Sequence, residues 1–307
     1  MRIIFAGTPE FAVPSLQMLL ASKHEVCAVY TQPDRPAGRG QKMQPSPVKD
    51  LAVSAGISVF QPLSLKPEVE LQQLRDLNPD LVAVVAYGMI LPQAALDIPK
   101  LGCLNVHGSL LPRWRGAAPI QRAVLAGDEK TGVTILRILP NLDAGDMLHK
   151  EECMITAQDT SGDLYVKLAA LGALGLEKVL AQVEFGTVKA EVQDENLVTY
   201  AEKLSKTEAE LDWTQSAEQL DKIVRGLNPW PVAQTRYNGQ VLRIWQAEPL
   251  VSGIKTDPGI IICTNKTLDV TTGDGLLRLH EAQLPGGKRL PIQAFLSSHY
   301  PQGVKLG

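Results

Sequence analysis

Short apolar segments alternate with segments of helical periodicity through the first half of the chain, and this alternation restricts the fold more than any other feature. Apolar runs predict strands at residues 2–6, 25–31, 58–60, 80–86 and 101–106. The periodicity between them predicts helices near residues 12–20, 47–55 and 66–77. Because a crossover helix returns the chain to the same end of a sheet, such strands pair in parallel. The sequence therefore predicts an α/β fold with a doubly wound, mainly parallel sheet.

Two more strands and a long helix follow this alternation. They are expected at residues 132–139, 147–155 and 160–183. Thr160 or Ser161 is expected to cap the helix, because a hydroxyl oxygen can accept a hydrogen bond from a free N–H group of the first turn. These elements complete a domain of residues 1–188, and the charged residues 189–207 are expected to link it to a second domain.

The last third of the chain predicts a small β-barrel of residues 208–307. Within this range a helix at residues 216–227, with apolar side chains on one face, comes before the strands. Asn238-Gly239 is the strongest hairpin signal in the chain, because both residues tolerate positive φ. Turns between residues 259 and 287 divide the rest into three strands and are expected at residues 265–266, 273–275 and 285–287.

Cysteine and histidine usage narrows the class of protein. The four cysteines lie far apart without a C-x-x-C pair, and the histidines do not cluster. Neither a zinc site nor a disulfide framework is therefore expected, and this pattern favours a cytoplasmic protein. The longest uncharged apolar stretch, residues 81–96, is interrupted by Gly88 and Pro92, and the first residues reach Glu10 before an apolar core forms. We expect neither export nor a membrane span.

The charge of the chain is unevenly distributed. A formal net charge of −3 gives the whole molecule no field that gathers phosphates. Residues 32–49, however, hold four basic residues and one acid, and residues 101–122 hold three arginines and no acid. The first segment is also too rich in Pro and Gly for a plain strand-to-helix connection, and such loops are either functional or merely solvated. We expect both segments to attract RNA if RNA is a partner.

The end of the first strand does not match a nucleotide-binding motif. Gly7-Thr8-Pro9 has proline where the second glycine of G-x-G-x-x-G is required, and no P-loop occurs in the chain. Roles for NAD and ATP are disfavoured, and Thr8 is expected to cap the first helix instead.

An amide, an imidazole and a hydroxyl meet at the end of the fifth strand. Asn105, His107 and Ser109 lie at or just beyond its carboxyl end, where open parallel sheets bind their ligands. Histidine is the best proton carrier near neutral pH, and asparagine can donate to an oxygen that gains negative charge, so the pair suits acyl-type transfer. The alternative interpretation is that Asn105 caps a turn and His107 is an ordinary strand-end histidine.

A loop at residues 139–148 offers a carboxylate partner for this imidazole. It holds Asp143 and Asp146 beside a glycine, and we prefer Asp143 as the residue that orients His107. The alternative is that either acid only forms the turn. Ser109 lies outside a G-x-S-x-G elbow, so no serine nucleophile is expected.

Several segments resemble a known family. They read F-A-G-T-P-E-F-A at residues 5–12, T-Q-P-D-R-P-A-G-R-G at 31–40, N-V-H-G-S-L-L-P-R-W-R-G-A-A-P-I at 105–120, T-Y-A-E-K-L-S-K at 199–206 and N-P-W-P at 228–231. In this order they resemble the methionyl-tRNA formyltransferase family. H-G-S-L-L-P alone marks the wider folate-dependent formyltransferases, whereas the basic loop, K-L-S-K and N-P-W-P point to the tRNA-directed enzymes.

The resemblance implies a Rossmann-like formyltransferase domain, followed by an OB-like barrel that binds tRNA. It further implies 10-formyltetrahydrofolate as formyl donor, initiator methionyl-tRNA as acceptor, no metal, and a cytoplasmic monomer. The catalytic positions of the family fall on Asn105, His107 and Asp143. Its folate-binding segment falls on Ser109, Leu110, Leu111 and Pro112.

The resemblance also gives the basic loop a role at the acceptor stem of the tRNA. Its contacts are expected from Arg39, with Lys42 and Lys49 in support, because a guanidinium can pair bidentately while an ammonium acts as a point charge. An easily opened terminal base pair in the initiator stem then carries specificity. Three residues of the two loops depart from the family pattern: Gln41, Asn141 and Ala144.

Two other functions remain open at this point. A formyltransferase that acts on a small amine, such as an aminoribonucleotide or an amino sugar, accounts for the catalytic residues but not for the basic loop or the barrel. A non-catalytic RNA-binding protein accounts for the barrel but leaves Asn105, His107 and Asp143 unexplained.

Overall fold

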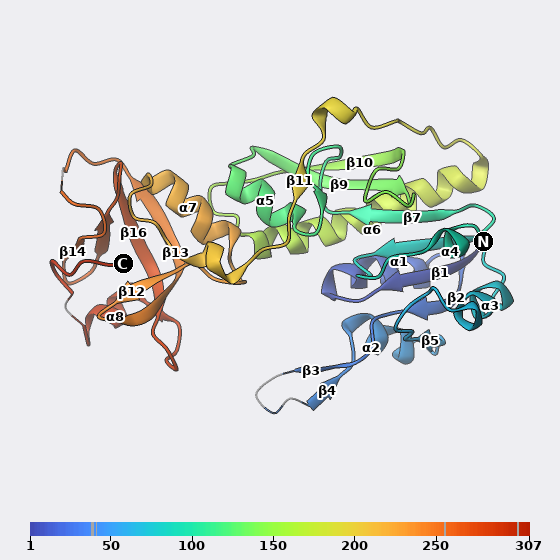
Figure 1. The fold of residues 1–307 in the computed structure, drawn as a ribbon, viewed down its shortest axis with the longest axis horizontal. Coiled ribbons are helices and arrows are strands. Elements are labelled where there is room, and N and C mark those ends of the chain that lie inside the picture. The colour runs from blue at the N-terminus through green and yellow to red at the C-terminus, as the bar shows by residue number, and fades with distance from the viewer. Residues whose placement is uncertain (38–39, 41, 255, 300) are drawn as a thin grey trace. The chain divides into compact units, whose positions relative to one another are not determined.

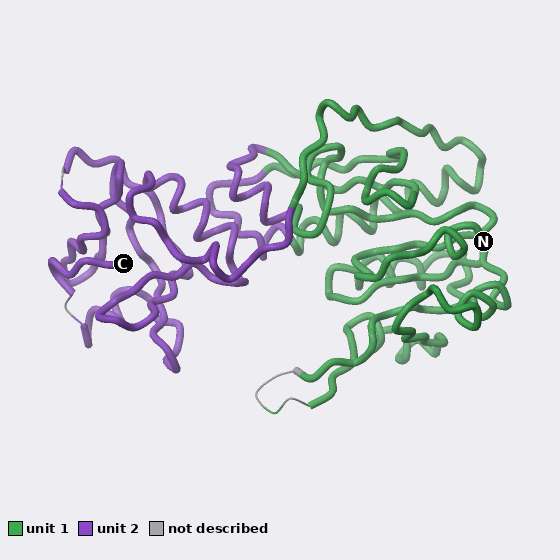
Figure 2. Tube along the Cα trace, viewed as in Figure 1, with its two compact units in different colours: residues 1–119, 130–154, 165–201 green, residues 120–129, 155–164, 202–307 purple. Residues whose placement is uncertain are grey.

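The chain forms two compact units in a computed structural model that describes residues 1–37, 40, 42–254, 256–299 and 301–307. Unit 1 contains residues 1–119, 130–154 and 165–201, and unit 2 contains residues 120–129, 155–164 and 202–307 (Figure 2). The predicted domain boundaries at residues 188 and 208 stay a prediction.

Unit 1 is built on one seven-stranded sheet. Its order is β10 (Met147–Met154), β9 (Lys130–Arg137), β7 (Cys103–His107), β6 (Leu81–Val85), β1 (Arg2–Gly7), β2 (Glu25–Tyr30) and β5 (Val59–Phe60) (Figure 1). Strands β7, β6, β1, β2 and β5 pair in parallel, whereas β9 pairs antiparallel with both β7 and β10. The Rossmann-like, mainly parallel α/β fold is confirmed, and so are all seven strands expected in this part of the chain.

Helices connect the parallel strands of this sheet as expected. The four predicted helices form as α1 (Val13–Ala21), α2 (Pro47–Ser54), α3 (Glu68–Asp76) and α6 (Ser161–Phe185). Two further helices were not predicted, α4 (Gln93–Leu96) and α5 (Pro119–Ala126). Thr160 caps α6, because its hydroxyl oxygen accepts from the Asp163 N–H. The prediction for Thr8 is wrong: its hydroxyl donates to the Tyr87 carbonyl, and the first turn has no side-chain cap. Among the described residues, no helix combines the length and apolarity needed to cross a membrane.

The packing of α6 against the sheet decides which way the residues of β7 point. A Cβ on Gly172 of α6 would lie 2.7 Å from Cγ1 of Val106, so only glycine lets the helix approach this closely. Val106 therefore faces α6. Because successive side chains of a strand point to opposite faces, Asn105 and His107 face away from that helix.

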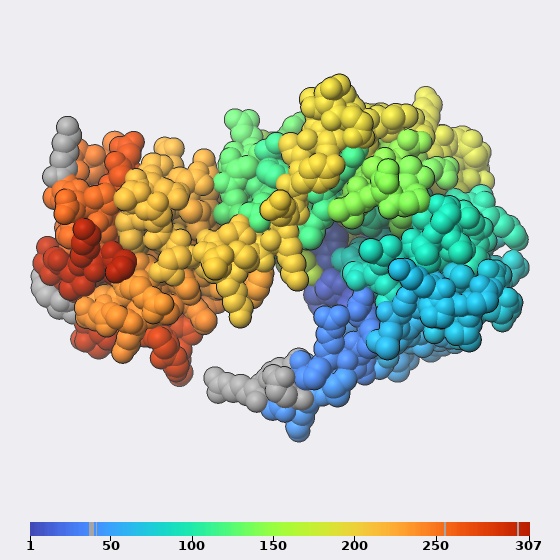
Figure 3. All heavy atoms as spheres, in the orientation of Figure 1, coloured from blue at the N-terminus to red at the C-terminus, as the bar shows by residue number. Residues whose placement is uncertain are grey.

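The basic segment forms a hairpin in the structure. Strand β3 (Arg35–Ala37) pairs antiparallel with β4 (Lys42–Gln44), and this arm extends away from the sheet of unit 1 (Figures 1 and 3). Its base is fixed by Lys49, whose ammonium donates to both oxygens of Asp34 at 2.8 and 2.7 Å and to Gln61 Oε1 at 2.8 Å. These hydrogen bonds from Lys49 hold the pKa of Asp34 below its usual range.

Unit 2 contains a curled antiparallel sheet. Its order is β12 (Gln234–Tyr237), β13 (Gln240–Leu250), β16 (Leu276–Gln283), β15 (Leu268–Thr271) and β14 (Ile261–Cys263), with β17 (Leu290–Pro291) beside β16. The predicted hairpin turn at Asn238-Gly239 is confirmed, with φ values of 49° and 78°. The three strands expected between residues 259 and 283 are β14, β15 and β16.

The last residues of the chain link the two edges of this sheet. Leu306 N–H donates to the Gly259 carbonyl beside β14, and Gly307 N–H donates to the Arg236 carbonyl of β12. The sheet is thus a half-barrel that the C-terminal segment completes, in agreement with the predicted OB-like fold.

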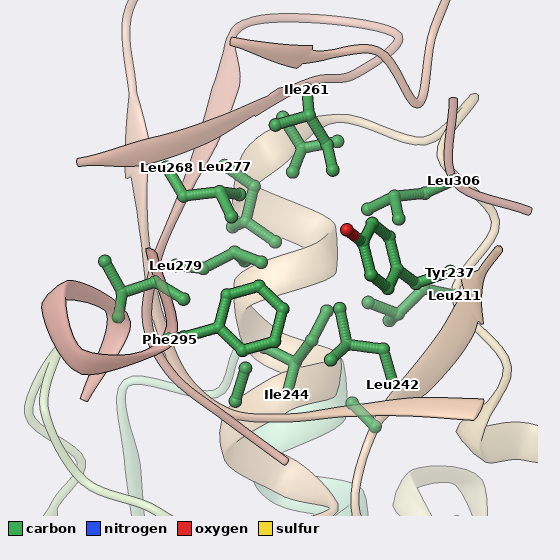
Figure 4. Close-up of a cluster of buried hydrophobic side chains, with 14 of the residues drawn as sticks. Leu211, Tyr237, Leu242, Ile244, Ile261, Leu268, Leu277, Leu279, Phe295 and Leu306 are labelled. Atoms are coloured by element: carbon green, nitrogen blue, oxygen red, sulfur yellow. The ribbon is translucent and has the colours of Figure 1, made fainter. Parts of the chain in front are cut away.

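Helix α7 (Ala217–Gly226) packs into this half-barrel and helps to form its core. Ser216 caps it by accepting from the Gln219 N–H. Buried side chains from the strands, from α7 and from α8 (Ile292–Leu296) make up one cluster. Ten of them are labelled in Figure 4: Leu211, Tyr237, Leu242, Ile244, Ile261, Leu268, Leu277, Leu279, Phe295 and Leu306.

Candidate active site

Strand β7 and the loop before β10 bring an amide, an imidazole and a carboxylate together. Asn105 Nδ2 donates to Asp143 Oδ1 at 3.2 Å. His107 Nδ1 lies 3.6 Å from Asp143 Oδ2. The three residues predicted to be catalytic are therefore neighbours in space, although Asp143 is 38 residues from Asn105 in the sequence. Their catalytic roles stay predictions.

Backbone groups hold the carboxylate of Asp143 in this position. The Gly116 N–H donates to Asp143 Oδ2 at 2.9 Å, so each carboxylate oxygen accepts a hydrogen bond. Asp143 itself has a φ of 49°, in the left-handed region that few side chains adopt. Two residues further on, a Cβ on Gly145 would lie 1.8 Å from the Arg137 carbonyl oxygen, so only glycine lets the loop pass this close to β9.

His107 is buried and is held from both sides of its ring. Its side chain is 6% exposed. Nε2 lies 2.8 Å from the Trp114 carbonyl oxygen, and because a carbonyl only accepts, Nε2 must carry the proton of this hydrogen bond. Nδ1 faces Asp143, so the carboxylate can stabilise the imidazolium form or accept a proton from it.

The surroundings offer no covalent nucleophile. Burial raises the pKa of the Cys103 thiol, two residues before Asn105, to about 12. The Ser109 hydroxyl is fully buried and donates to the Arg113 carbonyl at 2.7 Å. Within the described parts of the chain, no group of His, Cys, Asp and Glu side chains could hold a metal ion. The arrangement favours proton transfer and oxyanion stabilisation over covalent catalysis.

The predicted folate-binding segment turns back onto β9 directly after β7. Thr134 of β9 fixes it, because its hydroxyl donates to the Ser109 carbonyl and accepts from the Leu111 N–H. Leu111 is buried against Leu136 and Met147. Ser109 and Leu111 face the interior, so this segment offers a ligand its backbone groups and the half-buried side chains of Leu110 and Pro112.

Of the three residues predicted to contact tRNA, the structure describes Lys42 and Lys49, and Lys42 is the more exposed of the two. Arg39 lies outside the described residues. Lys42 is exposed on β4 of the hairpin. Lys49 is 25% exposed and pairs with Asp34 and Gln61 at the base of the hairpin, so much of its hydrogen-bonding capacity is used within the fold.

In the second basic segment, residues 101–122, two of the three arginines form ion pairs within the fold, and attraction of RNA by this segment stays a prediction. Arg115 is 3% exposed and pairs with Glu195 at 2.8 Å. Arg122 pairs with Glu208 at 2.5 Å. Counting charges along the chain could not reveal these partners, because both carboxylates come from residues about 80 positions away.

Sequence reasoning missed one side chain that contacts the active-site loop. Gln193 is buried, and its amide donates to the carbonyl oxygens of Asp143 and Gly145 at 2.7 and 2.8 Å. A single glutamine in a polar stretch carries no periodicity or motif that would indicate such a role.

The chain is similar to formyl transferases along most of its length. The family model described as "Formyl transferase" matches residues 1–180, and the one described as "Formyl transferase, C-terminal domain" matches residues 203–300. A curated relative, the methionyl-tRNA formyltransferase of Methylococcus capsulatus, is 56% identical over 307 residues, which cover 100% of both chains.

Solved structures share this fold at low sequence identity. An N-formyltransferase from Helicobacter canadensis, in complex with folinic acid and dTDP-3-aminofucose, has a TM-score of 0.71 and 17% identity, and the match covers 92% of this chain and 99% of that one. HypX from Aquifex aeolicus in complex with tetrahydrofolic acid has a TM-score of 0.64 and 18% identity, over 97% of this chain. The match covers 47% of HypX, so this chain spans about half the length of that protein.

Proposed function

Because the chain belongs to the formyl transferase family, we propose that it transfers the formyl group of 10-formyltetrahydrofolate to the α-amino group of methionine on initiator methionyl-tRNA. The observation that carries this proposal is the 56% identity, over the full length of both chains, to a methionyl-tRNA formyltransferase. The meeting of Asn105, His107 and Asp143 supports the same reaction class.

The proposed reaction exchanges one C–N bond for another. The lone pair of the neutral methionine amine attacks the formyl carbon, and the carbonyl oxygen becomes an oxyanion. As the oxyanion collapses, the bond from the formyl carbon to N10 of the folate breaks, and a proton passes from the amine to N10. Asn105 and protonated His107 stabilise the oxyanion, and Asp143 orients the imidazole and stabilises its charge. The step requires no metal.

Each substrate has a proposed place in unit 1. The folate lies along the segment from Ser109 to Pro112, where backbone groups, Leu110 and Pro112 remain available. The acceptor stem meets the β3–β4 hairpin, with contacts from Arg39 and Lys42. Lys49 lies at the base of the hairpin, where it fixes the arm by bonding to Asp34 and adds a positive charge beside the tRNA.

The OB-like barrel of residues 208–307 holds the body of the tRNA in this proposal, and residues 1–188 carry the chemistry. A chain with one site for each substrate needs no second copy, so we propose a monomer. Since its acceptor is used in translation initiation, we propose that it works in the cytoplasm.

A formylation assay with a panel of acceptors tests the function. Purified protein and 10-formyltetrahydrofolate should formylate methionyl initiator tRNA, while methionyl elongator tRNA reacts far more slowly and glycinamide ribonucleotide and amino sugars stay unreacted. Formylation of a small amine without reaction of charged tRNA would show that the protein is a small-amine formyltransferase. RNA binding without any formyl transfer would show that it is a non-catalytic RNA-binding protein.

The Arg39→Ala variant should lose discrimination between initiator and elongator tRNA. One bidentate guanidinium contact is worth about 1–3 kcal/mol, so kcat/KM for initiator tRNA should fall about 5–150-fold while KM for the folate stays unchanged. The dependence of tRNA affinity on salt should also become shallower, because one phosphate-facing cation is lost. Arg75→Ala is the matched control, since its guanidinium pairs with Glu68 on the surface of α3. Equal losses in the two variants would argue against a specific contact from Arg39.

A further inference from the structure

Residues 191–193 form a short edge beside the loop that carries Asp143. The N–H and carbonyl of Glu191 bond to the carbonyl and N–H of Met147, each at 2.8 Å, just after that loop. Gln193 then donates to the carbonyl oxygens of Asp143 and Gly145 at 2.7 and 2.8 Å. Two hydrogen bonds therefore join this edge to the first residue of β10, and two more join it to the loop itself, from residues 44 to 50 positions further along the chain.

The orientation of the Gln193 amide is determined by its other neighbour. Arg115 Nε donates to Gln193 Oε1 at 2.9 Å, and a guanidinium can only donate, so the amide oxygen must face Arg115. The NH2 group must then face the two loop carbonyls. Arg115 is itself held by Glu195, which accepts from both of its terminal nitrogens at 3.3 and 2.8 Å. Gln193 and Arg115 are both less than 5% exposed, so water does not readily replace these contacts.

Arg115 also belongs to the strand that holds the other side of Asp143. It forms β8 with Gly116, and β8 pairs in parallel with β11 (Tyr200–Ala201). The Gly116 N–H is the donor to Asp143 Oδ2. The side chain of Arg115 therefore contacts the residue that holds the main chain of Asp143, which is Gln193. The next residue after Arg115, Gly116, holds the carboxylate of Asp143.

We propose that Gln193 is a positioning residue for the transfer reaction: its amide, oriented by Arg115, holds the Asp143–Gly145 loop so that the Asp143 carboxylate meets Asn105 and His107. The inference rests on the proposed function. Gln193 does not contact a reacting atom, and its effect passes through Asp143. Because Asp143 occupies the left-handed region of φ, the loop depends on such outside contacts to keep its conformation.

Two substitutions separate positioning from a merely structural role. Gln193→Met keeps the volume but removes both the NH2 group that donates to the loop and the oxygen that accepts from Arg115. Gln193→Glu keeps the shape and the partner for Arg115, but turns a carboxylate oxygen toward the two loop carbonyls. A role limited to pairing Arg115 predicts that Glu is tolerated better than Met, and a role limited to filling space predicts that Met keeps the wild-type kcat. Positioning of the loop predicts that Glu is at least as damaging as Met.

The experiment compares formylation kinetics of wild-type protein and both variants with methionyl initiator tRNA. We expect kcat to fall about 10–100-fold in each variant, the scale of a small misplacement of a catalytic group, while KM for tRNA and for folate changes about threefold at most. Leu180→Ala is the control for stability, because Leu180 is buried on α6, the helix from which Asn105 and His107 face away. At a temperature where all variants are folded, it should lower Tm and leave kcat unchanged.

Three outcomes would overturn the inference: wild-type kcat in Gln193→Met, a higher kcat in Gln193→Glu than in Gln193→Met, or a loss confined to KM. Failure of the proposed function looks different, because then the wild-type protein itself does not formylate the tRNA.

Discussion

The His107→Ala variant should lose about 10²–10⁴-fold in kcat for formylation of methionyl initiator tRNA, the range that a positioned acid–base group contributes. The ring lies beside Asp143, with Nδ1 at 3.6 Å from the carboxylate. Because Nε2 is bonded to the Trp114 carbonyl oxygen, the Nδ1–H of the imidazolium is the donor to the oxyanion in this proposal, and alanine supplies no such donor. Steady-state kinetics with saturating folate and tRNA measure the effect, and KM for both substrates should change little, because the interaction is made in the transition state.

His24→Ala is the matched control for this variant. His24 lies in unit 1 beside the N-terminal amine and away from Asp143, so kcat should stay within about twofold of the wild-type value. A His107→Ala protein that keeps wild-type kcat, or that fails only to bind folate, would show that His107 is an ordinary strand-end histidine. Circular dichroism and Tm of the two variants establish that each is folded during the comparison.

The Asp143→Asn variant should lose about 10²–10⁴-fold in kcat as well, because catalysis by an oriented imidazole depends on its carboxylate. The carboxylate accepts from Asn105 on one oxygen and from the Gly116 N–H on the other. An amide has one acceptor oxygen, so it can satisfy only one of these donors and must turn its NH2 group toward the other or toward His107. The substitution changes the charge with almost no change in volume.

Asp146→Asn is the matched control, since it removes the same charge from the same loop. Its kcat should stay close to wild type, because the carboxylate that meets Asn105 and His107 belongs to Asp143. If Asp146→Asn were the inactive variant and Asp143→Asn the active one, the choice of Asp143 over Asp146 would be wrong. If both were active, neither acid would serve the imidazole.

The elements of the fold could be predicted because their signals are local. The strands of the main sheet and the Asn238-Gly239 turn depend on apolar periodicity and on residues that tolerate positive φ, and both are visible within a few residues. The cap of α6 was likewise predictable, because Thr160 and Asp163 are three positions apart. The cap predicted for Thr8 was wrong because its hydroxyl bonds instead to Tyr87, 79 residues away.

The candidate site was only partly predictable for the same reason. Asn105 and His107 stand on one strand, so their alternation places them on one face. Charge counting failed for Arg115, because burial and the distant Glu195 remove it from the surface. The β3–β4 pairing within the basic segment was also missed, because Pro and Gly are as common in solvated loops as in hairpins.

By itself the sequence determined the α/β class of the first domain, the Asn238-Gly239 hairpin of the second, and the residue types that suit acyl-type transfer, since each depends on neighbours along the chain. The tertiary structure alone decided that Asp143 meets Asn105 and His107, that Lys49 pairs at the base of the hairpin, and that Gln193 holds the Asp143 loop. Those contacts join residues 15 to 50 positions apart. Hydrogen-bond direction, burial and backbone conformation select such partners, and none of these is a property of a residue type alone.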